Sequence, residues 1–474
     1  MANVLFIDIP ILNENNFGLN DLVVKRRKAQ NCINLISGIP VPYESKNTIQ
    51  FSRGLLVLSA FLKNNSEHET VYINYEKVYS DNFYKILNNI DFVCIPGNNT
   101  AYIEIVKDIA KIVKIKKPTI KIIVGGYHVT YLSREVLLEC SEIDYIVRGE
   151  GEKTLLDIIN GKKVTQILGL AYRSFEKIVI NPDQILLKNN ELEIPDYTLL
   201  PEKLKKYSFN VQSIRGCLYR CSYCTNGFFW KKPRAMPIES LWKELEFLNS
   251  ELERNTMIHF SDNIFTLNKK RAINILKRII KSNFKLLFSC DIRAGYIDKE
   301  LVKYMEDAKF IKISIGFEDA DDRILSLNNK GISFYDNIAT AKVIKDNSGI
   351  FIEAYWIVGL PGTDEKSINT NINMIKYILK NRIVDTVSCN TMFTPLPGSP
   401  IFIDPSKFGV KYISNNWSNY IRSKLNPVCV LENVSNERIK MAYVQYENTI
   451  LNEYCYKLNC SISDLDELHN KINC

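Results

Sequence analysis

The sequence lacks the signals that direct a chain into or across a membrane. No apolar run reaches the roughly 18 residues that a membrane-spanning helix needs. Residues 4–7 are apolar, but no charged segment precedes them and no cleavage site of small residues follows, so we expect no secretory signal. These absences predict a cytoplasmic protein, in which thiols stay reduced.

Histidine is also scarce, and neither sign of charge is in large excess. The chain has four histidines against twelve cysteines. A histidine-rich metal centre is therefore disfavoured, whereas the cysteines can serve as metal ligands or as buried apolar residues. The formal net charge of +8 over 474 residues favours a merely basic protein. An anionic substrate or a weak nucleic-acid contact would also fit that charge, but no motif points clearly to nucleic acid.

Strands and helices are expected to alternate in the first part of the chain. Short apolar runs typical of buried strands lie at residues 4–9, 70–75, 91–95, 120–124 and 143–147. Helical patterns lie between them, at residues 51–62 and 103–115. This alternation predicts an α/β fold with a parallel, doubly wound (Rossmann-like) sheet, which we assign to residues 1–180.

Glycines follow three of these strands, at the edge where the sheet would present its carboxyl ends. They are Gly97, then Gly125 and Gly126, then Gly149 and Gly151. Ligands of such sheets bind beyond the carboxyl ends of the strands, and glycine there lets the backbone come close to a ligand. Ordinary turns between strand and helix favour glycine as well, so the spacing alone leaves both interpretations open.

A second alternating region follows a polar, proline-containing linker at residues 181–207. Its candidate strands are residues 212–214, 257–260, 286–290, 311–315, 351–358 and 386–392, and helical patterns separate them, for example at residues 240–252, 268–281 and 367–380. Six such units over residues 208–400 predict a partial (β/α)6 barrel, whose chemistry would lie at the carboxyl ends of the strands. Residues 401–474 are expected to form a helical C-terminal region.

Three cysteines with the spacing C-x3-C-x2-C follow the first strand of this region directly. They are Cys217, Cys221 and Cys224. Three thiolates on one compact loop can bind three irons of a 4Fe–4S cluster and leave the fourth iron without a protein ligand. That open corner can chelate the amine and carboxylate of an amino acid. The alternatives are three unrelated thiols or a zinc site, for which only His259 in this region could add a histidine ligand.

This motif resembles that of the radical S-adenosylmethionine (SAM) superfamily, and segments after the later strands extend the resemblance over roughly residues 205–400. The resemblance implies that the aromatic residue before the third cysteine, Tyr223, packs on the adenine of SAM. It also places Asp262 and Asn263, after the second strand, near the SAM amine. Arg293, after the third strand, would meet the SAM carboxylate.

Two later segments look like family signatures for the rest of SAM. Ser314-Ile-Gly316-Phe-Glu318 follows the fourth strand and is similar to the G-x-E signature, in which Glu318 would accept hydrogen bonds from the ribose hydroxyls. Gly359 lies in a G-L-P-G segment after the fifth strand and is also implied to lie at SAM. Each segment alone is short, and it is their order and spacing that carry the resemblance.

The first half, over about residues 1–160, resembles the cobalamin (B12)-binding domains that precede some radical SAM barrels. The matching segments begin at Gly125 and at Asp144. They imply cobalamin contacts by Gly97, Asn98, Gly125, Gly126, Tyr127, His128, Gly149, Glu150 and Gly151. No D-x-H-x-x-G motif is present, so we interpret His128 as a turn residue rather than a cobalt ligand. Residues 96–100 depart from the small, Gly- and Ser-rich form expected there, which leaves two possibilities, a domain that holds cobalamin and one that only keeps its fold.

Together the two resemblances imply a cobalamin-dependent radical SAM enzyme with a 4Fe–4S cluster, SAM and cobalamin as cofactors. They favour a methyltransferase, which would methylate an unactivated carbon through a 5′-deoxyadenosyl radical and a methyl group carried by cobalamin. The substrate would be a small molecule or a peptide, and a flavodoxin- or ferredoxin-type protein would supply the electron. The main alternative is a radical reaction without methyl transfer, such as a cyclisation, an oxidation or a rearrangement.

Two other classes are disfavoured. A methylthiotransferase would carry a second cluster on N-terminal cysteines, but Cys32, Cys94 and Cys140 are far apart and fall within strand or helix patterns, which indicates burial. A non-catalytic iron–sulfur or cobalamin sensor is the other class, and an intact cluster that does not cleave SAM would point to it.

Two groups of side chains keep open assignments. Four cysteines near the C-terminus could bind an auxiliary cluster, although their spacing matches no known pattern: Cys429, Cys455, Cys460 and Cys474. Several aromatic residues near the expected cavity are interpreted as core rather than as a substrate platform: Phe228, Phe229, Trp230 and Trp356.

Overall fold

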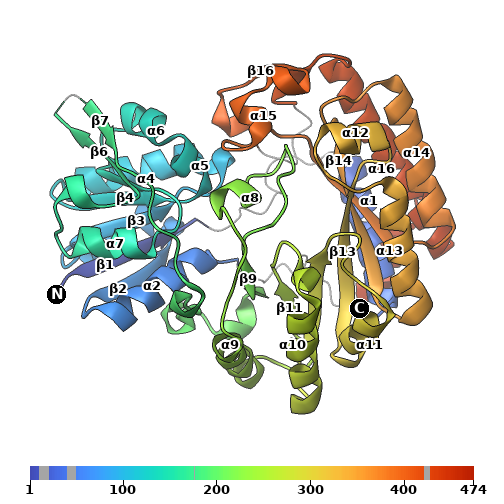
Figure 1. Ribbon diagram of the computed structural model, residues 1–474, viewed down its shortest axis with the longest axis horizontal. Helices are drawn as coiled ribbons and strands as arrows, with labels where there is room; N and C mark the ends of the chain where they lie inside the picture. The colour runs from blue at the N-terminus through green and yellow to red at the C-terminus, as the bar shows by residue number, and fades with distance from the viewer. Residues whose placement is uncertain (10–20, 40–49, 176, 421–426, 474) are drawn as a thin grey trace.

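A computed structural model describes residues 1–9, 21–39, 50–175, 177–420 and 427–473. The chain forms two α/β halves that lie side by side, with the segment around β9 and α8 between them (Figure 1). No helix among the described residues is long and apolar enough to cross a membrane.

The first half is built on a seven-stranded sheet in the order β2-β1-β3-β4-β5-β6-β7. Its five parallel strands are β1 (Asn3–Asp8), β2 (Glu69–Asn74), β3 (Phe92–Pro96), β4 (Lys121–Gly125) and β5 (Tyr145–Val147). An antiparallel hairpin, β6 (Leu170–Ser174) and β7 (Lys177–Ile180), extends one edge. The expected doubly wound parallel sheet is confirmed, and the hairpin is an addition that the strand pattern did not reveal.

Helices cover both faces of this sheet because its strands are apolar on both sides. They are α2 (Arg53–Asn65), α3 (Phe83–Leu87), α4 (Ile103–Lys116), α5 (Tyr127–Tyr131), α6 (Ser133–Glu139) and α7 (Glu152–Ile159). Along β1, Val4 and Phe6 belong to the apolar core that includes α2 and α7. The alternate residues Leu5 and Ile7 belong to the core that includes α4 and α6.

The second half is a sheet of six parallel strands in the order β15-β14-β13-β12-β11-β8. The strands are β8 (Phe209–Val211), β11 (Met257–Phe260), β12 (Leu287–Ile292), β13 (Phe310–Glu318), β14 (Phe351–Val358) and β15 (Thr386–Met392). The helices between them are α9 (Ile238–Glu251), α10 (Lys269–Ser282), α11 (Lys299–Asp307), α12 (Asp322–Leu327), α13 (Phe334–Asn347) and α14 (Glu365–Lys380). This arrangement confirms the expected partial barrel of six βα units.

Alternate residues of the barrel strands face different environments. Val211, Ile258, Cys290, Ile313 and Ile352 are buried in the apolar core. The residues between them point to the interior of the barrel and are polar: Asn210, Gln212, His259, Ser261, Asp291, Ser314 and Glu353. Complete parallel barrels are filled by apolar side chains, so this interior is instead suited to polar contacts.

The first barrel strand lies three residues before the expected segment 212–214. β8 ends at Val211, and Ile214–Arg215 forms the short strand β9, which pairs antiparallel with β10 (Arg234–Ala235). The chain leaves the barrel sheet here because the backbone N–H groups of Ser213 and Ile214 bond to the carboxylate of Asp262 instead of a neighbouring strand. The expected linker before this strand is packed: Leu187, Leu192 and Tyr197 are buried.

An early helix, α1 (Asp21–Ile36), lies against the barrel and not against the first sheet, although the range 1–180 included it in the first half (Figure 1). It packs on α16 (Asn436–Leu458) and α17 (Leu465–Asn473). Arg26 Nε donates to Glu447 Oε2 at 2.7 Å, and Gln30 Nε2 donates to Glu353 Oε1 on β14 at 2.9 Å. The two ends of the chain thus close the open side of the barrel together.

The C-terminal region is helical at its end, as expected, but it begins differently. A short helix, α15 (Pro400–Ile403), is followed by an antiparallel pair, β16 (Val410–Ile413) and β17 (Cys429–Leu431). The Tyr454 hydroxyl of α16 contacts both the backbone N–H and the carbonyl of Val387 on the outermost barrel strand, at 2.7 and 2.9 Å. This contact covers part of an edge that would otherwise be unpaired.

Candidate active site

The loop that carries Cys217, Cys221 and Cys224 leaves the barrel through the β9–β10 pair and continues into the short helix α8 (Asn226–Phe229). Gly216, directly before the first cysteine, has a φ of +94°, and an added Cβ would lie 2.8 Å from the Lys232 carbonyl oxygen. Only glycine fits this turn, because other residues are strained at positive φ and the backbone opposite cannot move away. The local chain geometry thus brings the cysteines onto one protruding loop.

The three thiols lie in mutual electrostatic contact. Desolvation raises the pKa of Cys217 and raises that of Cys224 to about 11, while the charges of Arg293 and Lys330 act in the opposite direction on Cys217. In the described part of the chain, no three Cys, His, Asp or Glu side chains converge as a single-ion site requires. A cubane cluster takes one thiolate at each of three different irons, and these three thiols can supply such a set.

Arg293 is the buried cation beside these cysteines. Its Nη1 lies 4.0 Å from Cys221 Sγ, and its guanidinium carbon lies 3.7 Å from the ring centroid of Tyr219. Its side chain is buried, yet Nε and Nη2 have no hydrogen-bond partner among the described residues. Buried donors are rarely left unsatisfied. The arrangement therefore suits an anionic group, such as the SAM carboxylate, placed between the cluster loop and this arginine.

Tyr223 and Glu318 also meet at the cluster loop. Burial raises the pKa of the Tyr223 hydroxyl well above its usual value, and the charges of Glu318 and Cys221 add to the shift. Glu318 forms an ion pair of 2.8 Å with Lys330. At Gly316 an added Cβ would come within 2.5 Å of Glu318 Oε1, so a side chain there would displace the carboxylate. Lys330 was not singled out from the sequence, because nothing near it in the chain marks it as the partner of Glu318.

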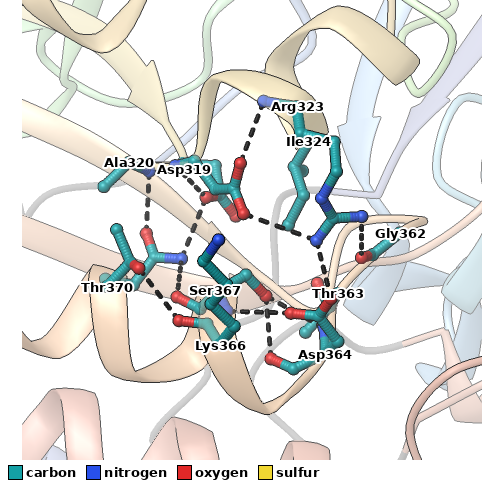
Figure 2. Close-up of polar contacts among 12 residues, drawn as sticks. Asp319, Ala320, Arg323, Ile324, Gly362, Thr363, Asp364, Lys366, Ser367 and Thr370 are labelled. Atoms are coloured by element: carbon teal, nitrogen blue, oxygen red, sulfur yellow. Dashed lines mark hydrogen bonds and ion pairs between the residues drawn. The ribbon is translucent and has the colours of Figure 1, made fainter.

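A buried polar network holds the turn that carries Glu318 (Figure 2). Glu318 has a φ of +65°, and Asp319 follows it in the interior. Asp319 Oδ1 accepts hydrogen bonds from the Asp321 backbone N–H at 2.8 Å and from Asn371 Nδ2 at 2.9 Å. Asn371 Oδ1 in turn accepts from the Ala320 N–H at 2.8 Å. These contacts tie the unusual backbone of Glu318 to α14.

The same figure shows how the start of α14 is held. Arg323 donates to the Gly362 carbonyl oxygen at 2.9 Å and to Asp364 Oδ2 at 2.9 Å (Figure 2). Asp364 caps the helix by accepting from the Ser367 N–H at 2.8 Å. The turns after β13 and β14 are therefore joined to each other.

The contacts of Asp262 differ from those expected of a residue that binds the SAM amine, which is the role that the resemblance implies. Its Oδ1 accepts from the backbone N–H groups of Ser213 and Ile214 at 2.6 and 2.9 Å, and its Oδ2 accepts from Ser213 Oγ at 2.5 Å. The carboxylate is buried, and burial raises its pKa to about 6. Both oxygens are engaged, so the contacts make Asp262 a support for the start of the cluster loop. The neighbouring Asn263 accepts instead from Asn226 Nδ2 of α8 at 2.5 Å.

The remaining implied SAM residues lie in two places. Ser314 is buried on β13, two residues before Gly316. Gly359 has a φ of +79°, and an added Cβ there would come within 3.0 Å of Ile439 on α16. That contact makes the close packing of the C-terminal helix a sufficient reason for glycine at this position.

A cavity of about 350 Å³ lies between the two halves of the chain. Its walls on one side come from the carboxyl ends of β3, β4 and β5 and from α2. The barrel contributes residues near the ends of β8 and β11, the base of the cluster loop, and α8. The lining residues named in the sequence analysis are Cys94, Asn98, Gly125, Gly126, Tyr127, Gly149, Glu150, Gly151, Phe229 and Trp230. This volume is in the range of ligand-binding sites.

Two of the implied cobalamin residues are not among those that line this cavity. Gly97 is covered by Val129, whose Cγ1 would lie 2.7 Å from an added Cβ. His128 is buried, its Nδ1 lies 3.2 Å from Thr100 Oγ1, and its ring packs edge-on against Trp417. Burial lowers the pKa of His128 to about 4. His128 lies in helix α5 and not in a turn as expected, and these contacts hold its side chain away from the cavity.

The described lining of the cavity consists of glycine turns, apolar side chains and polar groups but no histidine. An added Cβ at Gly54 or at Gly149 would meet no atom within 4 Å, so these lining positions border open space. Leu58, Ile95 and Val147 add apolar walls, and the lining contains no histidine. The carboxyl ends of a parallel sheet are where such folds bind ligands. A cobalamin held here would therefore rest on glycine turns and apolar side chains.

Glu150 lines the cavity but is engaged by arginines of the barrel half. Its Oε1 accepts from Arg215 Nη1 at 3.0 Å, and its Oε2 accepts from Arg234 Nη1 at 2.6 Å. Glu152 accepts from Arg215 Nη1 at 2.6 Å. The sequence analysis assigned Glu150 to cobalamin and did not single out the two arginines, because the pairing depends on how the two halves dock.

Tyr127 forms a second contact across the halves. Its ring stacks on Phe229 with centroids 4.1 Å apart, its hydroxyl accepts from Trp230 Nε1 at 2.7 Å, and it donates to Asn226 Oδ1 at 2.9 Å. Phe229 and Trp230 are thus interface residues that line the cavity, whereas Trp356 is fully buried in the barrel core.

The other described cysteines lie outside the cluster loop. Cys32, Cys94 and Cys140 are buried in α1, in β3 and after α6, on separate elements. Cys455 lies in electrostatic contact with both Cys460 and Cys32, and Cys429 is buried on β17. Cys474 lies outside the described residues.

Two family descriptions match the chain over these two halves. Residues 211–375 match the radical SAM superfamily, and residues 47–159 match the B12 binding domain. These matches confirm both resemblances seen in the sequence and the cofactor set that they imply.

Similar proteins have several named activities. An uncharacterized methyltransferase of Pyrococcus horikoshii is 29% identical over 71% of this chain and 74% of its own length. An anaerobic magnesium-protoporphyrin IX monomethyl ester cyclase of Rubrivivax gelatinosus is 27% identical over 62% of this chain, and the chain spans 54% of that relative.

Solved structures share the architecture at low identity. The radical SAM methyltransferase TsrM of Kitasatospora setae superposes with a TM-score of 0.67 at 15% identity, covering 95% of this chain and 89% of TsrM. The cobalamin-dependent SAM radical enzyme OxsB superposes with a TM-score of 0.71 at 16% identity, covering 93% of this chain and 66% of OxsB. The shared fold, the cysteine loop and the two matched domains together show that the chain is a radical SAM enzyme whose barrel is preceded by a B12-binding domain.

Proposed function

We propose that this protein is a cobalamin-dependent radical SAM methyltransferase that methylates an unactivated carbon of a small molecule. The observation that carries the proposal is the cavity between the halves, because it is bordered by the ligand-binding ends of both sheets. Gly149 and Gly151 of the first half and Arg215 at the base of the cluster loop line the same space. Ligands of the two domains would therefore meet there.

The residues of the chain would bind, orient and shield the reactants. When bound, the cluster and SAM supply a 5′-deoxyadenosyl radical, and cobalamin supplies a methyl group. Cys217, Cys221 and Cys224 would hold the cluster, and Arg293 and Glu318 would hold the charged and hydroxyl groups of SAM. Buried, close-packed walls would keep water away from the radical.

The barrel interior supports a substrate with polar groups. Asn210, Gln212 and Ser261 line the cavity where it meets the barrel. On the same face of β11, His259 Nδ1 lies 3.0 Å from Ser289 Oγ, and His259 Nε2 lies 3.5 Å from Asp291 Oδ2. Such groups can fix the orientation of a small molecule by hydrogen bonds.

The test uses protein reconstituted without oxygen and supplied with cobalamin, a reductant, SAM with a deuterated methyl group, and a small-molecule cell extract. We expect 5′-deoxyadenosine, S-adenosylhomocysteine and a product that carries the label. Absence of both nucleosides would overturn the proposal. 5′-Deoxyadenosine without S-adenosylhomocysteine would favour a radical reaction without methyl transfer, as the similarity to a cyclase allows.

Two alanine variants provide the control. Cys221→Ala removes a cluster ligand and should abolish 5′-deoxyadenosine formation. Cys140→Ala removes another buried thiol, in the first half, and should leave 5′-deoxyadenosine formation unchanged. Equal effects of the two substitutions would mean that the cysteine loop has no special role.

Two further assignments belong to this proposal. The electron would come from a flavodoxin- or ferredoxin-type protein, and the enzyme would work in the cytoplasm. Reduction of the cluster by a purified flavodoxin with its reductase, followed by SAM cleavage, would support the assignment of the electron donor.

A further inference from the structure

Four buried side chains form a chain of ion pairs between the two halves, which we call the Arg–Glu clamp: Glu152, Arg215, Glu150 and Arg234. The distances between their charged atoms are 2.6 to 3.0 Å. None of the four side chains is more than 7% exposed. Two positive and two negative charges balance, so the set is neutral as a whole.

The clamp joins two functional loops. Glu150 and Glu152 lie at the turn between β5 and α7, in the first half. Arg215 and Arg234 are opposite each other in the β9–β10 pair, at the two ends of the loop that carries the three cluster cysteines. Both glutamates and Arg215 also line the interdomain cavity. One set of contacts thus touches the cavity and holds the base of the cluster loop.

The two loops cannot shift independently while the clamp is closed. Moving one of them would separate buried opposite charges, and an unpaired buried charge is strongly unfavourable. Other contacts stiffen the same unit. The guanidinium of Arg215 lies 5.6 Å from the centroid of the Trp230 ring, and Glu150 Oε2 also accepts from the Leu187 backbone N–H at 3.1 Å. A displacement on the cavity side is therefore transmitted to the cluster loop.

We infer that the Arg–Glu clamp couples occupancy of the interdomain cavity to the position of the cluster loop, so that cobalamin and SAM bind cooperatively. This inference rests on the proposed function in one respect, namely that cobalamin occupies the cavity. The clamp residues act here as positioning residues, because they act on SAM through the loop. Coupling between two binding sites is reciprocal, so each ligand should tighten the other by the same factor.

The experiment measures the dissociation constant of SAM on cluster-loaded protein with and without hydroxocobalamin, by calorimetry. The dissociation constant of cobalamin is measured with and without SAM, by absorption. In the native protein we expect each ligand to lower the dissociation constant of the other about five-fold or more. In Glu152→Gln, which keeps the shape of the side chain but removes its charge, the factor should fall below the native value, because one of the three ion pairs between the loops is lost. The electron paramagnetic resonance spectrum of the reduced cluster should respond to cobalamin in the native protein and less strongly in the variant.

A second variant covers the case in which Glu152→Gln folds poorly. The double substitution E152Q and R215Q removes one charge of each sign and leaves Glu150 paired with Arg234. It should reduce the coupling factor more than Glu152→Gln does, because only the Glu150–Arg234 pair still joins the two loops, while keeping the iron content of the native protein.

A matched control distinguishes an effect of the clamp on the coupling factor from the effect of weakening any ion pair between the two halves. Arg53 of α2 forms a bidentate pair with Glu244 of α9, at 2.5 and 2.9 Å, and this pair also joins the two halves but lies outside the cluster loop. Glu244→Gln should keep the native coupling factor. Equal loss of coupling in Glu244→Gln would overturn the inference.

Two further outcomes separate this inference from the proposed function. If the native protein binds both ligands independently, or if both clamp variants keep the native factor, the inference is wrong and the proposed function stands. If the native protein binds no cobalamin, the proposed function is wrong and the inference falls with it.

Discussion

Replacing Arg293 by methionine should weaken SAM binding strongly and leave the stability of the protein almost unchanged. Arg293 is 5% exposed, and its Nε and Nη2 donors have no hydrogen-bond partner among the described residues. Methionine has a similar length and no donors, so it can fill most of the same space. The substitution removes the positive charge beside the cluster loop and little else.

The size of the effect follows from the contacts. A hydrogen bond to a charged group contributes about 1.5–3 kcal/mol, and each 1.4 kcal/mol is about a tenfold change in affinity. We therefore expect the dissociation constant of SAM to rise about 10- to 100-fold. Stability should change little, because two effects oppose each other. Losing the stacking of Arg293 on Tyr219 costs about 0.5–2 kcal/mol, while removing unsatisfied buried donors returns about 1–3 kcal/mol.

The assay is calorimetric titration of SAM into cluster-loaded protein, with iron content and thermal unfolding measured on the same samples. Arg278→Met is the control, since Arg278 pairs with Glu239 on the outside of the barrel and should not affect SAM. If Arg293→Met keeps its iron and binds SAM within two-fold of the native protein, the assignment of Arg293 to the SAM carboxylate is refuted.

Three other predictions concern single features of the site. Replacing Cys217, Cys221 and Cys224 together by alanine should give protein without iron, and iron retained in a colorimetric assay would reveal a second cluster. Burial raises the pKa of Asp319 to about 7 from its ordinary 3.8, so the folded chain keeps a proton that the unfolded chain releases. The free energy of unfolding should therefore fall by up to a few kcal/mol as the pH rises from about 4 to 7. Asp319→Asn should remove this slope in urea melts at pH 5 and pH 8, and equal slopes would contradict the prediction. His128→Ala should bind hydroxocobalamin as the native protein does in an absorption titration, because His128 does not line the cavity; a folded variant that binds none would contradict this.

The sheets and the cluster loop could be predicted because their signals are local. Each parallel strand is a short apolar run, since both of its faces are covered. Cys217, Cys221 and Cys224 lie within eight residues of one another, so their proximity in space follows from their proximity in the chain. Arg293 and Glu318 are distant in sequence, but each lies at the carboxyl end of a parallel strand, and neighbouring parallel strands end at the same edge.

Several elements could not be predicted because polar residues interrupt their apolar pattern. Helix α1 buries Arg26 and Gln30, whose partners Glu447 and Glu353 come from far along the chain. The polar residues of α1 therefore conceal, at the level of sequence, that this face of the helix is buried. The start of the barrel was misplaced by three residues for a related reason, since Asp262 takes the backbone N–H groups that would have continued the strand.

The amino-acid sequence by itself determined the fold class, the two domains and the three cysteines that would hold the cluster. Tertiary structure alone decided the rest: that Lys330 pairs with Glu318, that Asp262 supports the cluster loop, and that Glu150 meets Arg215 across the halves. The physical reason is range. Periodicity and motif spacing act between near neighbours in the chain, whereas a buried charge is satisfied by whichever partner the docking of distant elements brings within a few ångströms.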